Sequence, residues 1–201
     1  MKHRKKSLEG TFFIASLPRC RTAWLANFLT TGNSFCYHEA MKFCPTTRDL
    51  KPLFESRAVP YVGDSDSLLP FFIDEVLEIF PNAKLVVIER DPEKVIKSLQ
   101  RVFPEAADVP EAVLKTHRAL EEMKKKYEPK TFQFEALGKE EVCKEIWSYC
   151  LPKIPFDEVR WKVLDHMVVE IHPKKYLQHV RELPPEAGLR IFDTIRKYPF
   201  S

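Results

Sequence analysis

Two segments of the chain place arginines where an apolar run gives way to a predicted helix. The first is 18–22, Pro-Arg-Cys-Arg-Thr, which follows the apolar run 11–17. The second begins at Arg90, directly after the apolar run 84–89, and has Ser98 eight residues further on. Guanidinium groups bind phosphate-like oxyanions through paired N–H donors. The two junctions are therefore candidate sites for anionic groups; the alternative is solvent-exposed arginines, with Arg90 paired to Asp91 or Glu93.

The glycines of this chain do not form a known phosphate-binding loop. There are 5 glycines among 201 residues, and no two of them are close in sequence. This excludes the GxGxxG loop of dinucleotide-binding domains and the GxxxxGK[ST] loop of P-loop NTPases. An anion bound at these junctions must be held by side chains and by free backbone N–H groups at the start of a helix.

A candidate general base follows the short predicted strand 34–37, where His38 and Glu39 are adjacent. A carboxylate needs partial desolvation to act as a base near neutral pH, whereas imidazole has a pKa near ~6.5 without tuning. Neighbouring strand residues point to opposite faces, so we expect one of the two to face the site. Asp64 and Ser65 follow another short strand and are expected beside the same site.

The elements that must position these residues alternate between short apolar runs and amphipathic stretches, which is typical of an α/β domain with a parallel sheet. Ligands bind at the carboxyl ends of the strands in such a sheet. Thr22 and Asp91 are predicted to cap helices. Strands are predicted at 11–17, 34–37, 59–62, 84–89 and 131–134, and helices at 22–29, 68–80, 92–101, 110–127, 139–150, 157–169, 173–181 and 185–197.

Composition and charge narrow the class of protein. With 44% apolar residues, 30% charged residues and a net charge of +3, the chain is predicted to be globular, with neither a nucleic-acid partner nor a membrane span. The 5 cysteines include no CxxC pair, so we expect free thiols and a cytoplasmic location. Cys36, His38 and Cys44 lack a standard metal-ligand spacing, so no metal site is predicted.

The two junctions together resemble the sulfotransferases that use 3′-phosphoadenylyl sulfate (PAPS). The segment 18–25, Pro-Arg-Cys-Arg-Thr-Ala-Trp-Leu, is in register with the family pattern Pro-(Lys/Arg)-Ser-Gly-Thr-Thr-Trp-Leu. The segment 84–98 matches the second family pattern, an apolar strand followed by Arg-(Asn/Asp)-Pro and a later serine, here Arg90 and Ser98. The resemblance covers about residues 10–100.

The resemblance implies a fold and a set of roles. The fold is a three-layer α/β sandwich of the P-loop NTPase type, with a central parallel sheet and a helical C-terminal part. Arg90 and Ser98 would hold the 3′-phosphate of the donor, and Trp24 would lie near the adenine, although a core position is equally consistent with its sequence. Glu39 would be the base, with His38 as the alternative. The residues implied to hold the 5′-phosphosulfate are Arg19, Cys20, Arg21, Thr22 and Ala23, with Arg19 on the bridging oxygen.

Three residues of the first segment depart from the family pattern: Cys20, Arg21 and Ala23 replace Ser, Gly and Thr. Glycine at the second of these positions permits a positive φ or a close backbone approach. Arginine there is expected either to adopt another backbone conformation or to supply side-chain donors in place of backbone ones.

The sequence thus predicts a single sulfotransferase-like domain over 1–201, with a basic tail (1–9), a nucleotide-binding core (10–100) and a mainly helical remainder (102–201). The predicted reaction transfers a sulfuryl group from PAPS to a hydroxyl or amine, releases 3′-phosphoadenosine 5′-phosphate (PAP) and needs no metal. The acceptor is a small molecule, a saccharide or a peptide. Two alternatives remain open: a catalytically degenerate nucleotide-binding protein and an ATP-using phosphotransferase. The oligomeric state is not indicated.

Overall fold

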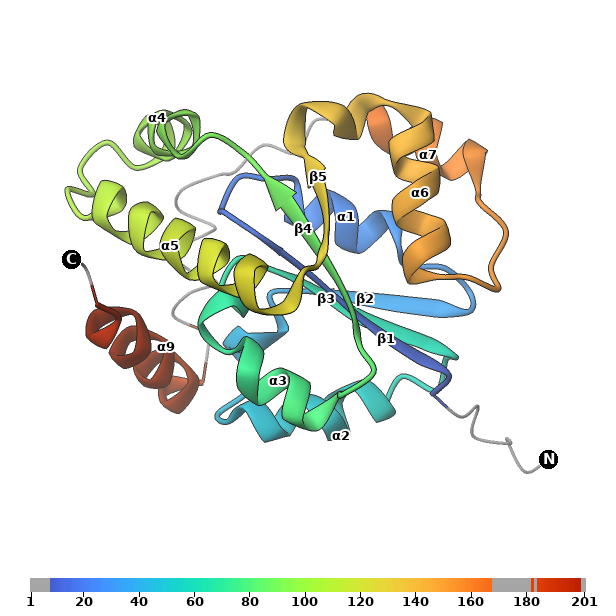
Figure 1. Cartoon of the computed structure of the whole chain (residues 1–201), viewed down its shortest axis with the longest axis horizontal. Helices are drawn as coiled ribbons and strands as arrows, with labels where there is room; N and C mark the ends of the chain where they lie inside the picture. The colour runs from blue at the N-terminus through green and yellow to red at the C-terminus, as the bar shows by residue number, and fades with distance from the viewer. Residues whose placement is uncertain (1–7, 168–181, 183, 200–201) are drawn as a thin grey trace.

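Five parallel strands form the centre of the protein, in the order β2-β3-β1-β4-β5 (Figure 1). The computed structural model describes residues 8–167, 182 and 184–199. The predicted α/β class with a parallel sheet is confirmed, while the predicted helix 173–181 and most of the basic tail 1–9 lie outside the described residues. The strands are β1 (Gly10–Ser16), β2 (Ser34–His38), β3 (Tyr61–Asp66), β4 (Lys84–Glu89) and β5 (Lys130–Gln133).

Helices cover both faces of this sheet. In Figure 1, α1, α6 and α7 lie on one side, and α2, α3 and α9 lie on the other together with the long helix α5. The helices are α1 (Thr22–Phe28), α2 (Leu50–Glu55), α3 (Ile73–Ile79), α4 (Pro92–Val102), α5 (Val109–Tyr127), α6 (Glu140–Cys150), α7 (Glu158–Asp165) and α9 (Pro185–Lys197). The 3₁₀ helices are η1 (Ala40–Phe43), η2 (Thr47–Asp49), η3 (Leu69–Phe71) and η4 (Phe134–Gly138).

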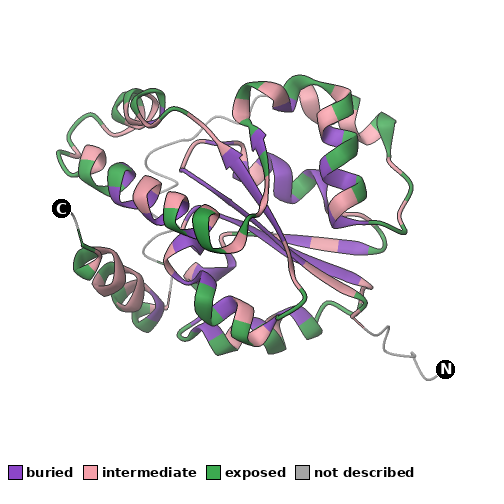
Figure 2. Ribbon diagram, in the orientation of Figure 1, coloured by how far each residue is buried: buried purple, intermediate pink, exposed green. Residues whose placement is uncertain are grey.

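The strands are buried on both faces because apolar side chains alternate between the two layers of helices (Figure 2). On β1, Phe12 and Ile14 enter the core under α1 and α6, whereas Phe13 and Ala15 enter the core on the opposite face. The ring of Phe12 needs Gly63 on the neighbouring strand, since a Cβ there would lie 2.2 Å from the ring.

Three predicted elements differ from the structure. The helix predicted at 157–169 ends at Asp165, where α7 ends. Strand β3 runs through Asp66 rather than ending at residue 62, because its polar residues are wholly buried and the carboxylates of Asp64 and Asp66 accept backbone N–H groups of η1. The predicted helix 68–80 is divided at Phe72 into η3 and α3. The predicted cap at Asp91 is confirmed, since its carboxylate accepts the N–H of Glu93 at 2.8 Å.

Helix α7 lies against both ends of α1. Near the start of α1, Trp24 Nε1 donates to the carbonyl of Leu164 at 2.8 Å. At its other end, the guanidinium of Arg160 donates to the carbonyl of Phe28 at 3.3 Å and to that of Asn27. The C-terminal part of the chain therefore helps to fix the helix that follows the first predicted anion-binding segment.

All 5 cysteines are free and buried. Within the part of the chain that is described, no helix has the length and apolar character needed to cross a membrane.

Candidate functional site

The loop between β1 and α1 contains two arginines in the left-handed backbone region. Arg19 has φ 64° and Arg21 has φ 60°. Arg21 is the N-cap of α1, so the predicted cap at Thr22 was wrong. The Thr22 hydroxyl instead lies 3.0 Å from Nε2 of His38, which brings the end of β2 into contact with this loop.

Arg21 follows neither of the two expectations drawn from its sequence. It keeps the positive φ that glycine would adopt freely, at a typical cost of ~1–3 kcal/mol. Its guanidinium pairs with Asp165 of α7 at 3.2 Å and lies 5.4 Å from the centroid of the Trp24 ring. The side chain is therefore engaged with α7 and does not replace backbone donors in the loop.

Arg19, Arg90 and Ser98 meet at the carboxyl ends of β1 and β4. Arg19 Nε donates to the hydroxyl of Ser98 at 3.3 Å. Arg90 Nη1 donates to the backbone carbonyl of Arg19 at 2.5 Å, and its guanidinium lies 4.0 Å from the Phe134 ring centroid. The two junctions that the sequence singled out are thus joined in one cluster.

This cluster carries positive charge without a matching carboxylate. Burial and the charge of Arg90 lower the pKa of Arg19. Among the described residues, neither arginine has a carboxylate oxygen within 4.0 Å. Nε of Arg90 is buried and has no hydrogen-bond partner there. Two half-buried guanidiniums with a free donor suit an anionic group such as a phosphate.

Two other predicted donor-binding residues are buried. Trp24 is 5% exposed, and its ring stacks on Phe28 with centroids 4.9 Å apart, so it has the core position that its sequence also allowed. Burial raises the pKa of the Cys20 thiol to about 12, which keeps it protonated at neutral pH. Ala23, in the first turn of α1, is partly buried.

Glu39 lies at the start of η1, also with a left-handed backbone (φ 59°). Its carboxylate pairs with Lys42 and accepts the Ser67 hydroxyl at 3.4 Å. Burial acts to raise the pKa of Glu39, but the charges of Lys42 and His38 outweigh it and leave that pKa below its usual value. Glu39 is therefore ionised at neutral pH: its carboxylate is desolvated by burial, but its pKa is not raised.

Asp64 and Asp66, at the end of β3, place two further carboxylates next to the turn that begins at Glu39. Burial and the charge of Asp66 raise the pKa of Asp64 well above its ordinary range. Burial and the charge of Glu39 raise the pKa of Asp66 to about 7. Their oxygens accept backbone N–H groups of the chain that follows Glu39. Among the described residues, no group of three or more His, Cys, Asp or Glu side chains is placed to hold a metal ion.

The sequence matches the family of sulfotransferase domains over residues 12–149, which is more than half of the chain. The chain belongs to this family. Two solved structures share its fold: mouse sulfotransferase SULT7A1 complexed with PAP (12% identity, TM-score 0.56, covering 96% of this chain and 85% of the mouse chain) and the sulfotransferase domain from the curacin biosynthetic pathway (16% identity, TM-score 0.58, covering 96% and 99%). No curated protein matches the sequence significantly.

Several residues of this sulfotransferase domain that contact Glu39 or its turn were not predicted from the sequence. Lys42, one helical turn after Glu39, and Asp66, two positions after Asp64 on the same strand, had spacings that could have suggested them. Arg190 is distant in sequence, and no motif or spacing around it indicated a role, yet it contacts the backbone after Glu39.

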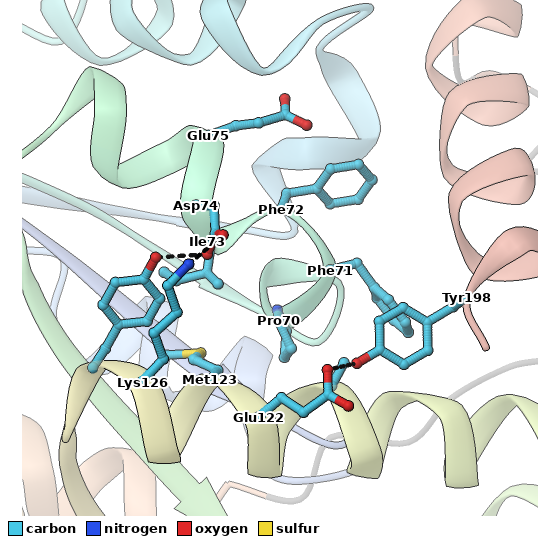
Figure 3. Close-up of a pocket in the computed structure, with 12 residues that line it drawn as sticks. Pro70, Phe71, Phe72, Ile73, Asp74, Glu75, Glu122, Met123, Lys126 and Tyr198 are labelled. Atoms are coloured by element: carbon cyan, nitrogen blue, oxygen red, sulfur yellow. Dashed lines mark hydrogen bonds and ion pairs between the residues drawn. The ribbon is translucent and has the colours of Figure 1, made fainter. Parts of the chain in front are cut away.

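A hollow of about 330 Å³ lies apart from this cluster, between η3, α3, α5 and Tyr198 (Figure 3). None of the residues that line it belongs to the predicted site. Polar side chains on its rim bond to one another, Lys126 to Asp74 at 2.5 Å and Tyr198 to Glu122. We therefore place the functional site at the arginine cluster and not at this hollow.

Proposed function

We propose that the protein transfers a sulfuryl group from PAPS to a hydroxyl or amine of an acceptor. The observation that carries the proposal is the pair Arg19 and Arg90, two half-buried guanidiniums with no carboxylate partner among the described residues, beside the hydroxyl of Ser98. Membership of the sulfotransferase domain family supports it, as does the PAP complex of mouse SULT7A1 for the nucleotide.

In this proposal Arg90 and Ser98 hold the 3′-phosphate of the donor, and the loop from Arg19 to Ala23 holds the 5′-phosphosulfate. The free Nε of Arg90 supplies an unused donor for the first of these groups. Trp24 has Phe28 stacked on its ring and the Arg21 guanidinium close by. An adenine bound against Trp24 would therefore have to displace Arg21.

The chemistry follows from charge placement. PAPS supplies the sulfuryl group, and the charge that develops falls on its bridging phosphate oxygen, where we assign Arg19 as the stabilising cation. Glu39, ionised because of Lys42 and His38, takes the proton from the acceptor hydroxyl or amine. No metal is needed for either role, and the acceptor is a small molecule, a saccharide or a peptide.

Calorimetry with two nucleotides tests the donor without knowledge of the acceptor. We expect the protein to bind PAP about 10- to 100-fold more tightly than AMP, as expected for hydrogen bonds to a charged phosphate. Arg90→Ala should abolish the preference, whereas Arg101→Ala, on the exposed end of the same helix, should leave it unchanged. Equal affinities for both nucleotides in the wild-type protein would contradict the proposal.

A second candidate function is nucleotide binding without turnover. The pairing of Glu39 with Lys42 favours it, because a carboxylate held by a lysine is a weaker base. If this second function is correct, the protein shows the same preference for PAP in calorimetry. It then transfers no radiolabelled sulfate from PAPS to any of a panel of phenols, amines, saccharides and peptides. The family assignment disfavours the third alternative, an ATP-using phosphotransferase.

A further inference from the structure

The turn that begins at Glu39 is hydrogen-bonded to two side chains at the end of β3. The N–H of Ala40 donates to both carboxylate oxygens of Asp64, at 3.1 and 3.2 Å. The N–H of Met41 donates to Asp66 at 3.3 Å. Both carboxylates are wholly buried, so these bonds fix the start of η1 against the sheet.

The same turn is also bonded by Arg190, which comes from α9. Its Nη2 donates to the carbonyls of Met41 and Cys44, both at 3.0 Å, and its Nη1 donates to the hydroxyl of Thr47 at 3.2 Å. The peptide groups on either side of Met41 are therefore bonded to an acidic and a basic side chain: the N–H donates to Asp66, and the C=O accepts from Arg190.

Packing fixes the place of the Arg190 guanidinium. It lies 4.5 Å from the centroid of the ring of Phe72, the residue between η3 and α3, and in Figure 3 this ring points toward α9. Burial lowers the pKa of Arg190, while Glu75 and other acidic groups act to raise it, so the side chain stays charged. The nearby α9 residues Leu189 and Phe192 are 67% and 63% exposed and add little packing.

We propose that Arg190 is a positioning residue for Glu39, so that the C-terminal helix helps to set the geometry of the catalytic base. The inference rests on the proposed function, in which Glu39 accepts the proton. Glu39 has a left-handed backbone, and such a conformation persists only where surrounding bonds over-determine it. Without Arg190, the carbonyls of Met41 and Cys44 lose this donor and the turn relaxes. Catalysis is sensitive to a displacement of the base by about 1 Å.

The experiment compares Arg190→Lys and Arg190→Gln with the control Arg196→Gln, which removes an exposed arginine of the same helix that pairs only weakly with Asp193. Three quantities are measured: hydrogen exchange of the amides from Glu39 to Cys44, the Kd for PAP, and kcat and KM for transfer from radiolabelled PAPS to 2-naphthol, or to water if 2-naphthol is not sulfated.

For Arg190→Gln we expect exchange of these amides to be about tenfold faster, since a charged hydrogen bond is lost. We expect kcat to fall about 10- to 100-fold through displacement of the base. The Kd for PAP should stay within about twofold, since the donor cluster is untouched. Arg190→Lys, which keeps the charge, should recover part of kcat, and the control should behave as wild type.

Unchanged exchange from Glu39 to Cys44, unchanged kcat, or an equal loss of PAP affinity in Arg190→Gln would overturn the inference. If Arg190→Gln does not fold, Arg190→Lys alone decides by the same criteria. Failure of the proposed function is recognised separately. In that case the wild-type protein shows no preference for PAP over AMP, or Glu39→Gln keeps full turnover, whatever Arg190 does.

Discussion

The two halves of the candidate site differ in which charged side chains lie close together. On the donor side, Arg19 and Arg90 lie together, and no carboxylate of the described chain lies within 4.0 Å of either. On the base side, Glu39 pairs with Lys42. Arg190 donates to the carbonyls of Met41 and Cys44, and the N–H of Met41 donates to Asp66, so acidic and basic groups share one network there.

This difference separates what each half is built to do. A cluster of like charges is unfavourable unless something compensates it, so the donor side is stabilised when an anion binds. On the base side, acidic and basic groups lie in one network, and its hydrogen bonds fix the geometry of its own backbone. The donor side should therefore control affinity for the nucleotide, and the base side should control the rate of transfer.

The largest effect expected from this division is on turnover when the base is removed. Glu39→Gln keeps the shape of the side chain but cannot take up the proton, so we expect turnover to fall about 10²- to 10⁴-fold. The affinity for PAP, measured by calorimetry, should be unchanged. Glu55→Gln, which changes the exposed last residue of α2, is the control.

His38 is the alternative base, and the same assay separates the two residues. If Glu39→Gln keeps its turnover while His38→Gln loses it, the division holds but the base is the histidine that contacts Thr22. The pH profile gives an independent answer. The lowered pKa of Glu39 predicts that its carboxylate is already ionised at pH 5, so its own titration causes no fall in rate between pH 5 and 6.

A smaller effect is expected within the β1–α1 loop, where the two arginines should differ. Arg19→Ala removes the cation assigned to the leaving oxygen, so we expect kcat to fall about 10²- to 10³-fold. Arg21→Lys should change kcat by less than about fivefold, because its guanidinium is engaged with Asp165 in a half-exposed ion pair. Equal losses in the two variants would show that Arg21 also reaches the donor.

The smallest effect is on stability and concerns the buried carboxylates. The pKa of Asp66 is raised to about 7 by burial and Glu39, whereas in the unfolded chain an aspartate ionises near ~3.9. Between these values the folded state binds more protons, so this contribution is full below about pH 4 and is lost as pH rises through about 7.

Urea unfolding at a series of pH values from 5 to 7 measures this contribution. The free energy of unfolding should decrease as pH rises, by up to ~1.4 kcal/mol per pH unit from Asp66. Asp66→Asn should give a shallower decrease, since Asp64 alone remains to titrate. An identical slope in the variant would mean that Asp66 is not protonated in the folded protein.

The sequence predicted the donor side better than the base side, for a physical reason. Strand β4 and the cap at Asp91 follow from local patterns, four consecutive apolar residues and an Asp-Pro pair, and both are confirmed. Local pattern also brought Arg90 and Ser98 to one edge of the sheet. No local pattern shows that Arg90 donates to the carbonyl of Arg19, because that contact depends on how the two loops approach each other.

The base side depends on contacts between distant parts of the chain. Asp64 and Asp66 are typical of a loop in sequence, and they belong to a buried strand only because backbone N–H groups after Glu39 compensate them. The local sequence of α9 does not distinguish Arg190 from other helical arginines, because its contacts depend on α9 lying beside η1. The left-handed backbone at Arg21 was also not predicted from the sequence, since arginine has no preference for that region.

The contacts of α7 with α1 bear on where a functional unit of this protein can end. The family match stops at residue 149, and a chain cut there would retain every strand of the sheet. It would lose Arg160, Leu164 and Asp165, which hold the two ends of α1 and the side chain of Arg21. A fragment designed from the family boundary alone would therefore lack the support of its own donor loop, and the segment through residue 165 belongs in any shortened form intended to bind nucleotide.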